Sequence, residues 1–364
     1  MRLASIEQEQ TFSRVRQYLP GPGRYRSRFR ICVALQLILL LLSAAYAQTP
    51  EQDDEVIRVE TDVTNLPLTA NDKNNRFITT LEQSDIRVLE DGIPQQLFTF
   101  QRETDRPLSL AFLIDVSQSE ERMLPEEKRA ARSFIETIIQ SKKDQAAIIP
   151  FTGSAFLEQG LTRDVFVIYR ALERVEVAQP SYLGSGRALT GITSGPGMKR
   201  PPQEGSTAIW EAIALTASEV LAKSPVQRRR AIILLTDGQD TTSRLKASEA
   251  IDAALGAETV IYAIGIGDSK YEGVDRDGLR SIAERTGGRA FFPKKDVDLN
   301  SVFKEIEQEL RTQYLIAYSS TNKKRNGAYR QIRIEVTNPL LLKEQLKLRY
   351  RPGYFAKPLQ NRER

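Results

Sequence analysis

Two kinds of hydrophobic pattern divide the chain. From residue 107 to 312, short apolar runs alternate with segments whose apolar positions recur at helical spacing. The runs predict strands at 108–114, 145–151, 231–235 and 260–266. The periodic segments predict helices at 125–139, 165–175, 207–222, 245–255, 278–285 and 302–311. Fully apolar strands separated by helices indicate an α/β fold, a Rossmann-like doubly wound, mostly parallel sheet covered on both faces.

On either side of this region the pattern changes to short alternating segments, typical of half-buried strands. They lie at 56–63, 85–89 and 96–100, and again at 314–318, 329–336 and 345–350. Asn326-Gly327 predicts a hairpin turn between 314–318 and 329–336. Each flank is too small for a comfortable core of its own. We therefore infer that the two flanks pair into one small β-sandwich, with the α/β domain inserted between them.

The first 47 residues have the order of a secretory signal peptide: an arginine-rich stretch, an apolar run at 31–42 and small residues ending in Ala45 and Ala47. An uncleaved anchor is the alternative, although the apolar span is short. Either way, we expect the chain to be exported, to a periplasm, the medium or the cell surface. The divisions are then 1–47 signal peptide, 48–55 flexible leader, 56–106 and 313–357 sandwich, 107–312 α/β domain and 358–364 tail.

The composition excludes several kinds of catalytic site and metal site. The chain has 364 residues, no histidine and one cysteine, Cys32. Ser-His-Asp and Cys-His catalysis and His- or Cys-ligated zinc sites are therefore excluded, so any metal must be held by oxygen. The net charge of +5 is carried by residues 1–47, and the remainder is neutral. Nothing in this balance favours nucleic acid, and no glycine motif favours a nucleotide. Arg228–Arg230, before an apolar strand, is expected to be a solvated loop.

Oxygen-bearing side chains cluster at predicted strand ends. Asp115 follows the first apolar run, and Ser117 and Ser119 stand at alternate positions after it. Asp237 follows another run, and Thr207 begins a helix. Carboxylates with hydroxyls form a hard-oxygen set suited to Mg²⁺ or Mn²⁺. Taken singly, the serines could cap a helix and Asp237-Gly238 could be an ordinary turn.

These five residues match, in order and context, the metal-ion-dependent adhesion site of von Willebrand factor A domains. The resemblance covers residues 107–312, and with the flanks and Arg351–Tyr354 the chain is similar to the exported, acidobacterial type of such proteins. It implies that Ser117, Ser119 and in some states Thr207 coordinate Mg²⁺ (or Mn²⁺ or Ca²⁺), and that Asp115 and Asp237 often act through water. It also implies a protein partner whose Asp or Glu completes the ion's coordination.

The sequence departs from that family at 176–204, where a short loop is usual. This stretch directly precedes Thr207, so we expect it to overhang the metal. Its candidate partner-binding residues are Tyr182, Arg187, Lys199 and Arg200. The alternative is a solvated insertion.

We therefore expect a binding protein and not an enzyme. A metal-stabilised envelope scaffold is the first alternative. A metal-dependent hydrolase is the second, and it lacks an obvious general base. Contact with a membrane is expected only through an uncleaved signal segment.

Overall fold

The computed structural model describes residues 63–102, 106–140, 142–177, the backbone of 187–188, 206–225, 227–266, 274–293 and 299–356. Contacts divide the chain into the units Met1–Glu60 and Thr61–Arg364, and all described residues belong to the second. The predicted signal peptide, leader and tail lie outside the described residues. Within the described part of the chain, no helix is long and apolar enough to cross a membrane.

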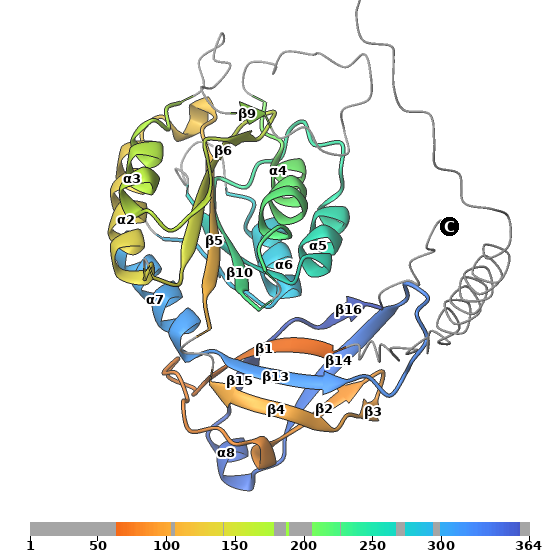
Figure 1. Cartoon of the computed structure of the whole chain (residues 1–364). Helices are drawn as coiled ribbons and strands as arrows, with labels where there is room; N and C mark the ends of the chain where they lie inside the picture. Colours follow the sequence, from red (N-terminus) through yellow and green to blue (C-terminus); the bar gives the residue numbers. More distant parts are fainter. Residues whose placement is uncertain are drawn as a thin grey trace, which may run out of the picture. The chain divides into compact units, whose positions relative to one another are not determined.

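A six-stranded sheet forms the centre of the α/β region (Figure 1). Its order is β12 (Ala290–Phe291), β11 (Thr259–Gly265), β10 (Arg229–Thr236), β5 (Leu108–Asp115), β6 (Gln145–Phe151) and β8 (Gln159–Thr162). All neighbours are parallel except β6 and β8. All eight residues of β5 are buried, as a strand covered on both faces requires.

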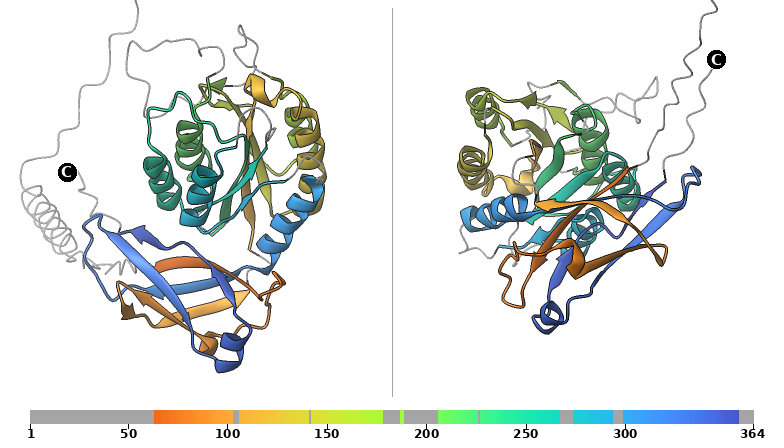
Figure 2. Two further views of the ribbon diagram at one scale, coloured as in Figure 1. Left: turned by 180° about the vertical axis from the view of Figure 1, so that it is seen from behind. Right: turned by 60° about the horizontal axis from the view of Figure 1, so that its bottom comes forward.

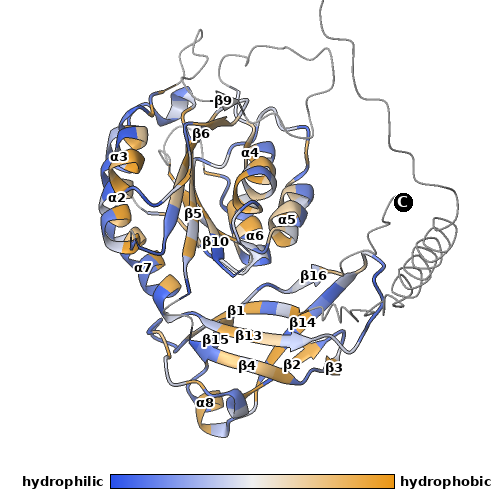
Figure 3. Cartoon of the chain, in the orientation of Figure 1, coloured by the Kyte–Doolittle hydropathy of each residue, from blue (hydrophilic) through white to orange (hydrophobic). Residues whose placement is uncertain are grey.

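Helices cover both faces of this sheet, as the view from behind also shows (Figure 2). One face packs against α2 (Leu124–Ile138), α3 (Val165–Glu173) and α7 (Leu299–Thr312). The other packs against α4 (Ile209–Leu215), its π-helical continuation η3 (Thr216–Leu221), α5 (Ala247–Gly256) and α6 (Arg276–Thr286). The side chains of β5 alternate between the two cores: Phe112 enters the first and Leu113 the second. In Figure 3 the apolar colour follows the strands and the sheet-facing sides of the helices.

The flanking segments build two antiparallel four-stranded sheets around a third core. One has the order β15 (Lys347–Arg349), β1 (Val63–Asn71), β13 (Tyr314–Ser319), β4 (Leu97–Arg102). The other has the order β16 (Gly353–Phe355), β14 (Tyr329–Val336), β2 (Ile86–Glu90), β3 (Ile93–Pro94). Each sheet takes strands from both sides of the α/β region, so the predicted fold class is confirmed. The domain boundaries stay a prediction.

Short elements complete the described chain. They are the 3-10 helices η1 (Gln83–Asp85) and η2 (Gln118–Glu120), the paired strands β7 (Phe156–Leu157) and β9 (Arg187–Ala188), and helix α8 (Pro339–Lys343).

One local prediction of the flanks is wrong. The expected hairpin of 314–318 with 329–336 does not form, because β13 and β14 belong to different sheets. The Ile316 and Ile332 side chains enter the same core from those two sheets, so residues 320–328 cross between them. The predicted strand 56–63 lies outside the described residues except for Val63, where β1 begins and runs to Asn71.

The arginine triplet is also not a solvated loop. Arg229 and Arg230 lie in β10, and Arg228 and Arg230 are each 8% exposed. Arg228 donates to Ser109 Oγ at 2.8 Å, and Arg230 donates to the Ala257 carbonyl at 2.9 Å. Because hydroxyl and carbonyl oxygens accept the guanidinium protons, burial of these charges is compensated by hydrogen bonds.

Candidate metal centre

Asp115 is buried at the carboxyl end of β5, beside the end of β10. Its Oδ1 accepts the backbone N–H of Ser117 at 2.9 Å, and its Oδ2 accepts the Thr236 hydroxyl at 2.6 Å. One carboxylate is thus oriented from its own loop and from the neighbouring strand. Asp115 is therefore held in place at the edge where parallel sheets bind ligands.

The two serines of the motif converge. Ser117 Oγ and Ser119 Oγ are 3.0 Å apart. Ser117 precedes η2, but its side chain makes no capping hydrogen bond there. The capping alternative is therefore wrong for Ser117, and its hydroxyl meets Ser119 instead of a helix amide.

Asp237 follows β10 and does form the ordinary turn that its sequence suggests. Its Oδ1 accepts the Gln239 N–H at 2.9 Å, and Gly238 has a φ of 83°, which favours glycine. This turn is compatible with a role of Asp237 as a ligand of the candidate metal. Carboxylate oxygens of Asp115 and Asp237 lie within 4.8 Å of one another.

Thr207 is 5% exposed and is anchored at the same edge of the sheet. Its N–H donates to Thr241 Oγ1 at 2.8 Å, and its carbonyl accepts the Thr241 N–H at 2.9 Å. The next residue, Ala208, donates its N–H to the Thr152 carbonyl at 2.8 Å. Thr152 follows β6 and Thr241 follows β10, so backbone hydrogen bonds tie the start of this helix to loops on both sides of β5.

The structure adds Glu120, which the sequence analysis missed. A carboxylate oxygen of Glu120 lies within the same 4.8 Å cluster as those of Asp115 and Asp237. Glu120 is 1% exposed, and Glu127 on α2 is equally buried. No described N–H or O–H group donates to Glu120 Oε2 or to either carboxyl oxygen of Glu127. The two buried carboxyls interact through their charges, and the charge of Glu127 raises the pKa of Glu120.

Burial without a counter-charge raises the pKa of these acids. Desolvation raises the pKa of Asp115 to about 6 and that of Glu127 to about 8. Desolvation and then the charge of Glu127 raise the pKa of Glu120 further, to about 10. None of Asp115, Glu120, Glu127 and Asp237 forms an ion pair with a described Lys or Arg.

This donor set fits a divalent cation. Carboxylates and hydroxyls are the ligands that Mg²⁺, Mn²⁺ and Ca²⁺ prefer. A cation would also supply the positive charge that the buried carboxyls lack and would favour their ionised forms. Asp115, Ser117, Ser119 and Asp237, with Glu120 and the nearby Thr207, are the residues that would hold it.

Most of the predicted partner-binding loop lies outside the residues that the structure describes. Tyr182, Lys199 and Arg200 lie outside the described residues. The backbone of Arg187 is described in β9, where it pairs with Leu157 of β7. The role of all four residues stays a prediction.

The candidate metal centre lies at the carboxyl ends of parallel strands in a doubly wound sheet, and comparison with known protein families shows to which family such a domain belongs. Two models of the von Willebrand factor type A domain match, one over residues 110–239 and the other over residues 197–308. Together they span more than half of the chain and include all five motif residues. The chain therefore belongs to the von Willebrand factor type A domain family. No curated protein matches it significantly.

Several solved structures are distantly similar to this chain. The conserved hypothetical protein BatB from Bacteroides thetaiotaomicron is 20% identical, with 56% of this chain and 97% of that chain covered and a TM-score of 0.41. A von Willebrand factor type A protein from Catenulispora acidiphila is 13% identical over 82% and 74% of the two chains, with a TM-score of 0.45.

Proximal thread matrix protein 1 from the mussel byssus, described with a zinc-occupied metal-ion-dependent adhesion motif, is 18% identical, with a TM-score of 0.46. The match covers 50% of that protein and 61% of this chain. These distant likenesses carry no functional conclusion, and the family assignment rests on the two domain models.

Proposed function

We propose that this chain is an exported binding protein that recognises a protein partner through a divalent cation. Asp115, Ser117, Ser119, Thr207 and Asp237 hold the ion, and an Asp or Glu of the partner completes its coordination. Mg²⁺ is the proposed ion, with Mn²⁺ or Ca²⁺ as alternatives. The protein acts in the periplasm or at the cell surface, as the exported, acidobacterial type would, and it is not an enzyme.

The convergence of Asp115 and Asp237 carries this proposal. Their oxygens lie within 4.8 Å of each other although they end different strands, and Ser117 and Ser119 meet beside them. Buried carboxylates without cationic partners cost free energy, so this arrangement is explained best by a bound cation. Hydroxyl ligands leave the ion electrophilic enough to take a carboxylate from another molecule.

Glu120 keeps the scaffold alternative open. A carboxylate from the chain itself could take the place that a partner's carboxylate would fill, and the ion would then only stabilise the fold. In that case metal raises the melting temperature, but cation removal leaves capture of partners unchanged.

Glu120 also bears on the hydrolase alternative, because its carboxyl lies beside the candidate metal position and could act as a general base in the ionised form that a cation would favour. Its 1% exposure speaks against this role. A screen of phosphoester and peptide substrates tests it, and turnover lost in Asp237→Ala would overturn the binding proposal.

The first test is thermal unfolding with Mg²⁺, Mn²⁺, Ca²⁺ or EDTA, for the native chain and for Asp115→Ala. A ligand at 100 times its Kd stabilises by about 2.7 kcal/mol, so we expect a clear rise in Tm that is lost in the variant. Asp277→Asn is the matched control, because its side chain is 95% exposed. Partner capture from exported proteins, with and without EDTA, follows. Capture that survives both EDTA and Asp115→Ala would contradict metal-bridged recognition.

A further inference from the structure

A second candidate site lies at the opposite edge of the sheet from the metal centre. A cavity of about 500 Å³ is bounded by the end of α5, the start of β1, the connection 320–328 and the β16 region. Helix α5 ends at Gly256, just before β11 begins at Thr259, so the cavity faces the amino ends of the parallel strands. Small-ligand sites have volumes of this order, roughly 300–1,000 Å³.

The walls of the cavity combine apolar surface with positive charge. Leu255, Tyr354, Phe355 and Ala356 supply apolar contacts. The charged lining residues are five cations and two anions: Lys323, Lys324, Arg325, Arg330, Arg351, Asp252 and Glu258. This excess of cations favours a ligand that carries negative charge.

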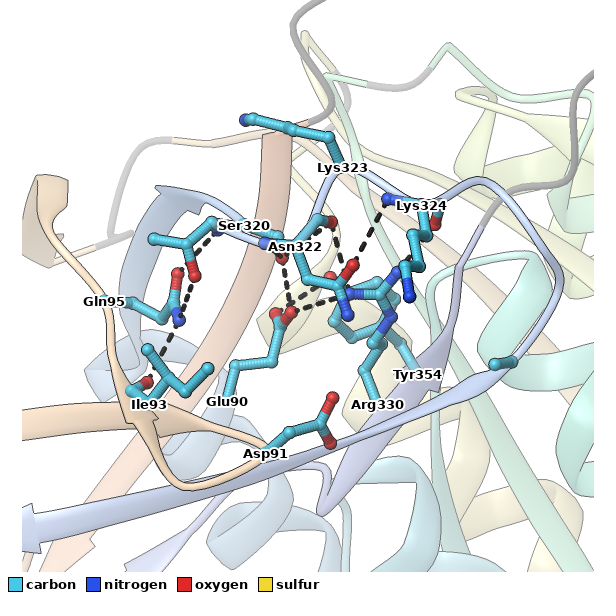
Figure 4. A network of polar contacts seen from close by, with 12 residues as sticks. Glu90, Asp91, Ile93, Gln95, Ser320, Asn322, Lys323, Lys324, Arg330 and Tyr354 are labelled. Carbon is cyan, nitrogen blue, oxygen red and sulfur yellow. Dashed lines mark hydrogen bonds and ion pairs between the residues drawn. The ribbon is translucent and has the colours of Figure 1, made fainter.

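One of these cations, Arg330, already has its counter-ion. Its Nη1 lies 3.3 Å from Glu90 Oε1, and both side chains are buried. Figure 4 shows that contacts from Ser320 and Tyr354 also converge on the Glu90 carboxylate. Because Glu90 is engaged in this way, it does not neutralise the remaining cations of the cavity.

Arg351 has no ion pair of this kind. Burial lowers the pKa of its guanidinium, although the negative charge of Glu258, another lining residue, acts on it and opposes that shift. It is 6% exposed, yet no described carboxylate forms an ion pair with it. Its Nη2 donates to the Asn65 carbonyl at 2.8 Å, and its Nε has no hydrogen-bond partner among the described residues. A buried guanidinium with no carboxylate at ion-pair distance is costly, and a ligand that brings a negative charge into contact with it would lower this cost.

Lys323 and Lys324 are exposed on the connection at the rim. In Figure 4 the Lys323 side chain points away from Glu90, and its Nζ donates to Ser319 Oγ at 2.8 Å. The Lys324 ammonium has no ion pair with a described carboxylate. Lys324 is therefore a cation at the rim that a ligand could engage.

We propose that this cavity binds a small organic anion, a carboxylate or phosphate carried on an apolar body. Arg351 pairs with the anionic group through its planar guanidinium, Lys324 assists from the rim, and Leu255 and Phe355 contact the apolar part. This inference is independent of the metal centre and goes beyond metal-bridged recognition.

The test is calorimetric titration of the full chain with phenyl phosphate, benzoate and inorganic phosphate. EDTA is present throughout, because a carboxylate probe could otherwise coordinate an ion at the metal centre. We expect phenyl phosphate or benzoate to bind at least about tenfold more tightly than inorganic phosphate, since only the organic probes contact the apolar wall. Equal affinity for inorganic phosphate, or no binding of any probe, would overturn the proposal.

Two variants locate the binding. Lys324→Gln removes an exposed charge without disturbing the core and should weaken binding severalfold to roughly tenfold. Arg351→Lys keeps the charge but loses the planar fork that pairs with carboxylate and with phosphate, so phenyl phosphate and benzoate should both bind more weakly. Lys343→Gln, on α8 and not in the lining, is the matched control. Binding unchanged in both Lys324→Gln and Arg351→Lys would place the probes elsewhere and refute the site.

Discussion

Asp115 shows, at the scale of the residue, how this fold builds a charged site inside a protein. Both of its oxygens accept hydrogen bonds, one from its own loop and one from the Thr236 hydroxyl. These donors stabilise the ionised form, but desolvation is larger and raises its pKa to about 6. Among the described residues, no donor reaches either carboxyl oxygen of Glu127 or the Oε2 of Glu120. A cation at the centre would change the free energy of all three carboxyls.

The variant Glu127→Gln, studied in the presence of EDTA, tests how far the buried Glu127 carboxyl lowers the stability of the metal-free fold. The pKa of Glu127 is raised from 4.5 to about 8, so the folded state holds a proton that the unfolded state loses. Native stability should therefore fall as pH rises from about 4.5 to about 8. At pH 8.5 we expect the variant to be more stable than the native chain, by on the order of 1–3 kcal/mol, and at pH 4 the difference should vanish.

Urea unfolding at the two pH values measures this difference. Glu121→Gln, a neighbouring exposed site, is the control and should show little change at either pH. A Glu127→Gln variant that is less stable than the native chain at pH 8.5 would show that the carboxyl is compensated in a way the hydrogen bonds do not reveal.

At the scale of the element, tight backbone approaches set the packing of helix and strand. Gly288, after α6, lies against β11 so closely that a Cβ there would collide with the Ile261 carbonyl oxygen. Gly256, at the end of α5, has no atom within 4 Å of the same position. Gly288 is therefore required by close packing and Gly256 is not, a difference that the sequence around them does not reveal.

Alanine at these two positions should give opposite results. Gly288→Ala forces backbone to move and should destabilise the fold by roughly 1–3 kcal/mol or more. Gly256→Ala, its matched control, should be neutral or stabilising by up to about 1 kcal/mol, because alanine favours helix. Thermal unfolding of both variants measures the effect. Equal stabilities for the two variants would mean that the β11–α6 contact is looser than its geometry indicates.

At the scale of the molecule, an ion pair joins the α/β region to the sandwich. Glu309 on α7 is fully buried, and its Oε2 accepts from Arg349 Nη1 on β15 at 2.7 Å. The Tyr262 hydroxyl also reaches Glu309, at 3.5 Å. Burial raises the pKa of Glu309, and Arg349 opposes that rise.

Arg349→Gln should therefore leave an uncompensated buried carboxyl and destabilise the fold by about 3 kcal/mol. The loss should be smaller at pH 5 than at pH 8, because a protonated Glu309 needs no counter-charge. Arg333→Gln, which breaks an exposed pair with Glu335, should cost less than about 1 kcal/mol. Denaturant unfolding compares the two variants. A loss for Arg349→Gln that does not depend on pH would rule out Glu309 as its cause.

The local patterns of the chain determined individual strands well, both in the α/β region and in the sandwich. The residues of β5 and β14 are almost those that the hydrophobic periods predict, and the motif of Asp115, Ser117, Ser119, Thr207 and Asp237 could be placed at strand ends. The spacing of apolar residues depends on which face of an element is buried, so it can be recognised without knowing which elements pack against that face.

Only the tertiary structure decided which distant groups share one environment. It put β13 and β14 in different sheets despite the Asn326-Gly327 signal, because apolar faces from both flanks had to close one core. It buried Arg228 and Arg230, and it brought Glu120 and Glu127 behind the metal motif. Charged residues are expected at the surface from sequence alone, and burial of these depends on carbonyls, hydroxyls and carboxyls that other elements supply.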